Sequence, residues 1–277
     1  MTYKIIGDSC TDITDEMKQE GMISLVPLTL TIDGEQFVDD ETFDQKSFLE
    51  KMKQSEECPK SACPSPERYM REFEGQEECY VVTLSSKLSG SYNSAVLAKN
   101  MYQEIHPECK IEVVDSKSAS CGQMLLAVKL KELKEKGFSF EEVQKKIAHF
   151  RDNMQTKFVL ESLENLRKNG RLSRVFFALC NVLHIRPVMA AEEGEIIKID
   201  QTRGHKKALM RMIEFIEADA KEVRSKILGI SHCNNRERAE MVKQEILKRV
   251  PFKDCIIVNT AGVATLYAND GGIIVSY

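Results

Sequence analysis

The chain has 277 residues, a formal net charge of −4 and 42% hydrophobic residues, close to the composition of ordinary globular proteins. Its length exceeds the roughly 100 to 200 residues of a typical domain, so we expect two domains with a cleft between them. A negative net charge does not favour nucleic acid as a partner. No stretch approaches the ~20 apolar residues of a membrane span, and the start MTYKIIGDS lacks the apolar core of a secretion signal. We therefore expect a cytoplasmic protein without membrane insertion.

The nine cysteines and five histidines are scattered along the chain. A C-x-x-C pair and the H-E-x-x-H pattern are both absent, so the sequence predicts neither a metal site nor a disulfide framework. The nucleotide-binding patterns G-x-G-x-x-G and G-x-x-x-x-G-K-[ST] are missing too, and we expect no cofactor.

Strand and helix patterns alternate through residues 1–155, which predicts a first domain built on a parallel α/β sheet. Apolar strand patterns at 3–7, 79–82 and 109–114 each precede a polar turn. Helical patterns follow at 14–20, 43–53, 67–74, 94–101, 119–135 and 141–153. Asp33-Gly34, between the apolar stretch 23–32 and residues 36–38, is typical of a hairpin or a bulged strand. The proline-rich segment 56–66 predicts a loop.

Residues 156–277 predict a second, mixed α/β domain. The almost wholly apolar helical pattern at 175–183 must be buried in a core or line an apolar cavity, and the sequence leaves both possibilities open. A hairpin is predicted around Glu193-Gly194. Helices are expected at 205–220 and 235–249, strands at 185–190, 196–199, 226–231, 254–259 and 273–277, and a glycine-rich loop at 260–272.

The segment from Thr83 to Ser94, TLSSKLSGSYNS, holds five serines where a buried strand gives way to a helix. A helix N-terminus presents unpaired N–H groups and attracts anions. One N-cap would explain Ser89 or Ser91, but not five serines. Serines also follow the strands that end at Asp8 and Asp115, and the carboxyl ends of parallel strands form a ligand-binding edge. We therefore predict a site for a carboxylate or phosphate at this edge.

The site chemistry favours binding over catalysis. The nucleophile motif G-x-S-x-G is absent. Neutral hydroxyls with Lys87 and Arg171 suit holding an anion, although either basic side chain alone is also typical of a solvated surface. The alternative is a serine-dependent enzyme acting on a small acylated or phosphorylated substrate, with Ser89 or Ser91 as nucleophile. Such a nucleophile needs a general base within hydrogen-bond reach.

Several segments together resemble the DegV family over essentially the whole chain. They are Asp8-Ser9 with Asp12, CPKSACPS at 58–65, LSSKLSGSYNSA at 84–95, Val114-Asp115-Ser116, Gly170-Arg171-Leu172-Ser173 and Ile185-Arg186-Pro187. The resemblance implies a lipid-binding protein of two domains that binds one long-chain fatty acid between them. It also implies a partner, a fatty acid kinase that phosphorylates the carboxylate, while the binding protein itself performs no phosphoryl transfer.

Carried onto this sequence, the resemblance implies that the carboxylate is held by Ser61, Ser89, Gly90 and Ser91, with Arg171 near the mouth of the site. It further implies an acyl tunnel, whose wall we expect to include Phe176, Leu179 and Val182 from the apolar helix.

Two positions depart from the family pattern. Ala62 stands where a second hydroxyl is common, and Leu266 is aligned with the family's histidine. We expect Thr265 and Leu266 to lie in a loop over the head group, where Leu266 offers no hydrogen-bond donor.

Overall fold

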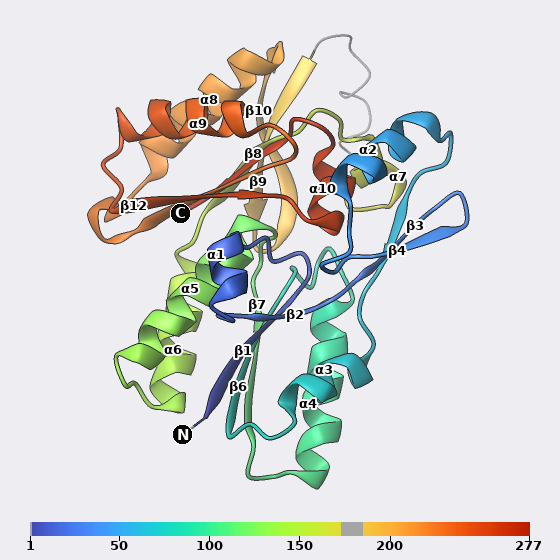
Figure 1. The fold of residues 1–277 in the computed structure, drawn as a ribbon. Helices are drawn as coiled ribbons and strands as arrows, with labels where there is room; N and C mark the ends of the chain where they lie inside the picture. Colours follow the sequence, from blue (N-terminus) through green and yellow to red (C-terminus); the bar gives the residue numbers. More distant parts are fainter. Residues whose placement is uncertain (1, 173–184) are drawn as a thin grey trace.

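The structure, a computed structural model, describes residues 2–172 and 185–277. Within these residues the strands form one sheet of four strands, one of six and one of three. The four-stranded sheet lies in the lower part of Figure 1 and the six-stranded sheet in the upper part. The predicted α/β fold, with a parallel sheet in the N-terminal part and a mixed sheet in the C-terminal part, is confirmed.

The parallel sheet has the strand order β2-β1-β6-β7. Its strands are β1 (Tyr3–Asp8), β2 (Ser24–Val26), β6 (Glu78–Thr83) and β7 (Lys110–Asp115). The helices of this part are α1 (Asp15–Gln19), α2 (Gln45–Gln54), α3 (Pro66–Phe73), α4 (Ser91–Ile105), α5 (Cys121–Glu135) and α6 (Phe140–Asp152).

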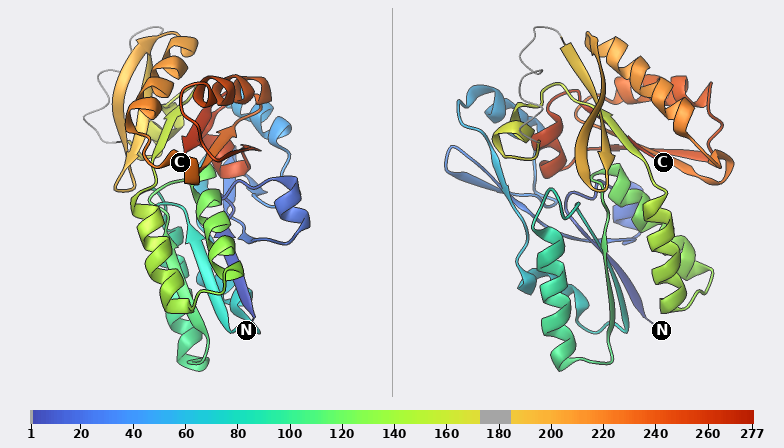
Figure 2. Two further views of the ribbon diagram at one scale, coloured as in Figure 1. Left: turned by 90° about the vertical axis from the view of Figure 1, so that its left-hand side faces the viewer. Right: turned by 180° about the vertical axis from the view of Figure 1, so that it is seen from behind.

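Helices cover both faces of the parallel sheet, so every residue of β6 is buried. Tyr80 and Val82 pack with α5 and α6, whereas Cys79 and Val81 pack with α3 and α4. Figure 2 shows these two helix pairs on opposite sides of the sheet. The near-continuous apolar run of β6 follows from this double burial.

Local capping residues explain where several helices begin. The side chain of Thr14 caps α1, and Ser139 with Glu142 forms a capping box at α6. Helix α4 begins at Ser91, three residues before the predicted start at 94. The serine segment, residues 83–94, therefore contributes the first turn of the helix as well as the loop before it.

A small antiparallel sheet, β4-β3-β5, extends from the parallel one. Its strands are β3 (Thr29–Ile32), β4 (Glu35–Val38) and β5 (Lys60–Ala62). The hairpin at Asp33-Gly34 is confirmed, and both residues have positive φ (52° and 76°), as a tight hairpin turn requires. Two expectations change: the stretch 23–32 divides into β2 and β3, which lie in different sheets, and the predicted loop 56–66 contains β5.

The six-stranded sheet has the order β10-β9-β8-β13-β11-β12. Its strands are β8 (Thr156–Val159), β9 (Ile185–Glu192), β10 (Glu195–Arg203), β11 (Ile227–His232), β12 (Asp254–Asn259) and β13 (Ile273–Ser276). The helices of this part are α7 (Glu164–Lys168), α8 (His205–Asp219), the 3-10 helix η2 (Val223–Ser225), α9 (Arg236–Leu247) and α10 (Gly262–Ala268). The hairpin around Glu193-Gly194 is confirmed as β9 and β10.

The predicted loop 260–272 is wrong over its central part, because residues 262–268 form helix α10. The N-cap residue is Ala261, whose side chain makes no capping hydrogen bond, and the helix begins at a glycine. The local sequence therefore carries no signal for a helix start. Its first N–H groups are instead satisfied by carboxylates far away in the sequence, as described below.

Helix α5 lies between the two large sheets. Its apolar residues share one core with Ile5 and Val82 of the parallel sheet and with Val258 of the mixed sheet. Polar contacts continue the junction, with the Ser120 hydroxyl 2.7 Å from the Ser231 hydroxyl. Among the described residues, no helix combines the length and apolarity needed to cross a bilayer.

Candidate functional site

A pocket of about 670 Å³, including its solvent-open part, lies between the parallel and mixed sheets. Its lining is almost wholly apolar and comes from both halves of the chain. The apolar lining includes Leu84, Leu88, Phe158, Leu160, Val263 and Ala264. Such a pocket suits a hydrophobic ligand or ligand segment.

Four polar side chains of the pocket lining come from four different segments: Ser61 of β5, Ser89 before α4, Arg171 after α7 and Tyr267 of α10. The Ser61 and Tyr267 hydroxyl oxygens are 3.1 Å apart. Arg171 Nε donates to the Leu88 carbonyl at 3.2 Å, which places the guanidinium beside the serine segment. Burial raises the pKa of Tyr267, so its phenol stays protonated and can donate.

Ser89 lies at the N-terminus of α4. Its Oγ accepts a hydrogen bond from the Ser91 backbone N–H at 3.2 Å. Among the residues that the structure describes, none accepts a hydrogen bond from the Ser89 hydroxyl, which leaves its proton for a ligand. Gly90 is the N-cap residue, and a Cβ there would lie 3.1 Å from Cys63 Sγ. The loop is therefore closely packed against the segment that follows Ser61.

The structure does not bring the Ser91 side chain to the pocket. Its hydroxyl is fully buried, lies 2.7 Å from the Tyr69 hydroxyl and donates to Asp8 Oδ2 at 2.5 Å. Asp8 also accepts from the Leu84 N–H at 2.7 Å, so this carboxylate fixes the serine segment from behind. Ser91 has a potential base in Asp8 but no access to a pocket ligand, which removes support for Ser91 as a nucleophile.

Thr265 and Leu266 also face away from the pocket. The Thr265 hydroxyl accepts from Gln45 Nε2 at 2.9 Å, and Leu266 is fully buried among apolar residues such as Leu30 and Phe48. The structure differs here from the expectation that Leu266 covers the head group. In a helix, residues 263, 264, 267 and 268 share one face, while 265 and 266 lie on another.

Sequence reasoning missed Tyr267, because residues 260–272 were predicted to form a loop. A helical interpretation of the same residues would have placed Tyr267 on one face with Val263 and Ala264. That periodicity was the available signal, and the glycines on either side of it concealed the helix.

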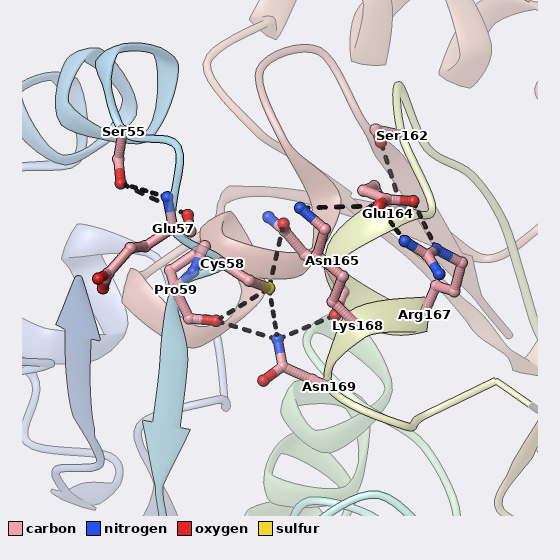
Figure 3. Close-up of polar contacts among 10 residues, drawn as sticks. All are labelled: Ser55, Glu57, Cys58, Pro59, Ser162, Glu164, Asn165, Arg167, Lys168 and Asn169. Atoms are coloured by element: carbon pink, nitrogen blue, oxygen red, sulfur yellow. Dashed lines mark hydrogen bonds and ion pairs between the residues drawn. The ribbon is translucent and has the colours of Figure 1, made fainter. Parts of the chain in front are cut away.

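Cys58 and Pro59, which directly precede strand β5 and its Ser61, are tied to the second half of the chain by an amide network (Figure 3). Asn169 Nδ2 donates to the Pro59 carbonyl at 3.0 Å and to Cys58 Sγ at 3.3 Å. Asn165 Nδ2 donates to the Leu266 carbonyl in α10 at 2.8 Å. Helix α7 therefore holds β5 and α10 next to one another, which fixes Ser61 beside Tyr267.

Other hydroxyls at the pocket wall are occupied by protein partners. Ser120 bonds to Asp12 and Ser231, and Thr156 lies 2.7 Å from the Ser118 hydroxyl. The other polar side chains of the described pocket are Ser61 and Tyr267, which hydrogen-bond to one another, together with Ser89 and Arg171. The predicted tunnel residues Phe176, Leu179 and Val182 lie outside the described residues.

Residues 2–277 match the sequence model of the DegV family, which is described as a family of uncharacterised proteins. A DegV domain-containing protein of Streptococcus pneumoniae is 38% identical over 282 residues, covering 100% of this chain and 99% of the relative.

Solved structures of three relatives contain fatty acids. A DegV family protein from Ruminococcus gnavus with vaccenic acid has a TM-score of 0.97 and 44% identity, with 100% of each chain covered. The fatty acid kinase (Fak) B3 protein of S. pneumoniae, loaded with linoleic acid, has a TM-score of 0.91 and 36% identity. The match covers 100% of this chain and 99% of that one. A DegV family protein from Eubacterium eligens, loaded with heptadecanoic acid, has a TM-score of 0.91 and 30% identity. The match covers 99% of this chain and 98% of that one. Sequence and fold agree over the whole chain, and this protein belongs to the DegV family.

Proposed function

We propose that this protein binds one long-chain fatty acid, with the acyl chain in the apolar pocket and the carboxylate at its polar end. The observation that carries the proposal is the pocket itself: an almost wholly apolar lining that also includes the polar side chains of Ser61, Ser89, Arg171 and Tyr267. Support comes from the relatives that hold vaccenic, linoleic and heptadecanoic acid in the same fold.

The two parts of the ligand make different contributions to affinity. Burial of each methylene contributes about 0.8 kcal/mol, so the acyl chain supplies most of the binding energy. Hydroxyl donors to a carboxylate contribute about 1.5 to 3 kcal/mol each and fix the orientation of the chain. Ser61, Ser89 and Tyr267 provide these donors, while Arg171 provides positive charge near the mouth.

The proposal includes a division into two domains, residues 1–155 and 156–277, with the ligand between them. Both contribute to the pocket wall, for example Leu84 from the first and Phe158 from the second. We assign Phe176, Leu179 and Val182 to the remaining wall of the acyl tunnel. Gly90 is assigned to the head-group loop through its backbone.

The proposed role of the complex is to present the fatty acid carboxylate to a fatty acid kinase. This partnership draws support from the fatty acid kinase B3 protein, whose fold matches over the whole chain. The protein then acts as the acyl-binding subunit, and the kinase supplies ATP and the catalytic groups.

Native mass spectrometry of protein purified from cells, followed by lipid extraction, tests the binding proposal. We expect one fatty acid per chain, and the delipidated protein should take up vaccenic acid in a titration. A protein that carries no lipid and does not bind vaccenic acid contradicts the proposal. Acyl phosphate formed from the loaded protein, ATP and a fatty acid kinase catalytic subunit tests the partnership separately.

A further inference from the structure

Helix α10 presents Tyr267 to the pocket, and its N-terminus is held by a carboxylate from the other half of the chain. Asp39 Oδ1 accepts from the Gly262 N–H at 2.6 Å, and Oδ2 accepts from the Val263 N–H at 3.0 Å. The Ser9 hydroxyl donates to Oδ2 at 2.8 Å. Both carboxylate oxygens are therefore engaged by donors, and two of the donors are the unpaired N–H groups of a helix start.

The surroundings show that this contact is specific. Asp39 is only 3% exposed, and burial raises its pKa to about 6, against the lowering effect of its three hydrogen bonds. A Cβ at Gly262 would lie 2.6 Å from Asp39 Oδ1, so only glycine permits the carboxylate this close to the helix. Asp12 strengthens the same junction by accepting from the Ala261 N–H at 2.6 Å.

Asp39 does not line the pocket, so any effect on a ligand must pass through α10. The helix has seven residues, and Tyr267 lies a little over one turn after Gly262. A tilt at its N-terminus would therefore move the Tyr267 hydroxyl away from Ser61, 3.1 Å from it in this arrangement.

We propose that Asp39 is a positioning residue for head-group recognition: by anchoring the N-terminus of α10 across the domain junction, it fixes the Tyr267 hydroxyl beside Ser61. This inference rests on the proposed function, because it assigns a role in holding the fatty acid carboxylate. It adds a residue that neither touches the ligand nor lies in the serine segment.

The Asp39→Asn variant tests the anchor. The amide has nearly the same size, but its NH₂ group must face a donor, so at least one of the three hydrogen bonds is lost. We expect the affinity for vaccenic acid to fall about tenfold, with faster release. Gly262→Ala displaces the carboxylate and should reproduce this loss. Asp40→Asn is the matched control. The Asp40 side chain accepts hydrogen bonds from Thr42 at the surface, so this variant should keep the affinity of the unmodified protein for vaccenic acid.

A double-mutant cycle separates positioning from general loosening of the fold. If Asp39 acts through Tyr267, the Asp39→Asn change should cost little further affinity in a Tyr267→Phe background. The methyl ester of vaccenic acid lacks the carboxylate, and its affinity should be the same in the Asp39→Asn and unmodified proteins.

Additive losses in the cycle, or an equal loss for acid and methyl ester, would overturn the positioning role, as would unchanged affinity in Asp39→Asn. If Asp39→Asn does not fold, the same cycle with Gly262→Ala gives the decision. Failure of the unmodified protein to bind vaccenic acid would instead contradict the proposed function, so the two failures are distinguishable.

Discussion

At the scale of single residues, buried carboxylates hold the segments that line the pocket. Asp8, Asp12 and Asp39 are nearly or fully buried and accept hydrogen bonds from backbone N–H groups of the serine segment or the start of α10. The sequence indicated that Asp8-Ser9 belongs to the ligand-binding edge. It gave no indication that these side chains orient other segments, because their partners lie up to 249 residues away.

Asp12 makes fold stability depend on pH. Burial raises its pKa from 3.8 to about 7, so between these values the folded chain holds more protons than the unfolded chain. The stability linked to this group is therefore fully present below pH 3.8 and is lost as pH rises through about 7.

The Asp12→Asn variant removes this dependence while keeping the contacts. The asparagine oxygen can still accept from the Ala261 N–H, and its NH₂ can donate to Ser120, which already bonds to Ser231. We expect the free energy of unfolding at pH 8 to rise by on the order of a few kcal/mol, because one pKa unit corresponds to 1.36 kcal/mol. The gain should shrink toward pH 4. Urea unfolding at pH 5 to 8 measures this gain in stability, with the exposed Asp15→Asn as control. An Asp12→Asn protein less stable than the unmodified protein at pH 8 would show that the buried carboxylate does not lower stability.

At the scale of elements, most of the fold was predictable and the exceptions share one cause. Residues 79–82 and 109–114, and the Asp33-Gly34 turn, carry their periodicity or turn chemistry locally, and they form β6, β7 and the β3–β4 hairpin. Helix α10 and strand β5 do not, because Asp39 holds the first and β3 pairs with the second. Ser61 and Ser89 line the pocket, and their contact with a ligand stays a prediction, whereas placing Tyr267 at the pocket required recognising α10.

The two faces of α10 predict opposite effects of substitution. Leu266 is fully buried in the core, so Leu266→Ala should lower the free energy of unfolding by about 2 to 5 kcal/mol and leave fatty acid affinity nearly unchanged. Tyr267→Phe should keep stability but weaken binding by about 1.5 to 3 kcal/mol, the contribution of a hydrogen bond to a charged group. Chemical unfolding and fatty acid titration of both variants provide the measurements. A binding loss confined to Leu266→Ala would show that the head group lies on the other face of α10.

At the scale of the whole molecule, the two halves meet through the β9–β10 turn as well as through α10. Ser85 donates from its hydroxyl to the Gly194 carbonyl at 2.7 Å, and Lys117 Nζ lies 2.5 Å from Glu193 Oε2. Ile196, just after this turn, lines the pocket. The turn therefore couples the fit between the halves to one wall of the ligand site.

Gly194→Ala tests this coupling. A Cβ at Gly194 would lie 2.6 Å from Ser85 Oγ, and the backbone φ of +85° already disfavours any other residue. Gly137→Ala is the matched control, because its φ is +77° and nothing lies within 4 Å of the new Cβ. Both variants should share the cost of the positive φ, and Gly194→Ala should lose a further ~1 to 3 kcal/mol through overpacking.

The steric part of that loss of stability can be reversed at a single residue, because the atom nearest to the new methyl group is the Ser85 hydroxyl oxygen. Combining Gly194→Ala with Ser85→Ala should therefore recover part of the stability, although Ser85→Ala alone removes a hydrogen bond and is destabilising. Vaccenic acid should leave Gly194→Ala faster than Gly137→Ala, because only the first displaces the strand that carries Ile196. Thermal unfolding and stopped-flow release of the fatty acid measure the two effects. Equal stability and equal release rates in both glycine variants would show that the β9–β10 turn does not control the pocket.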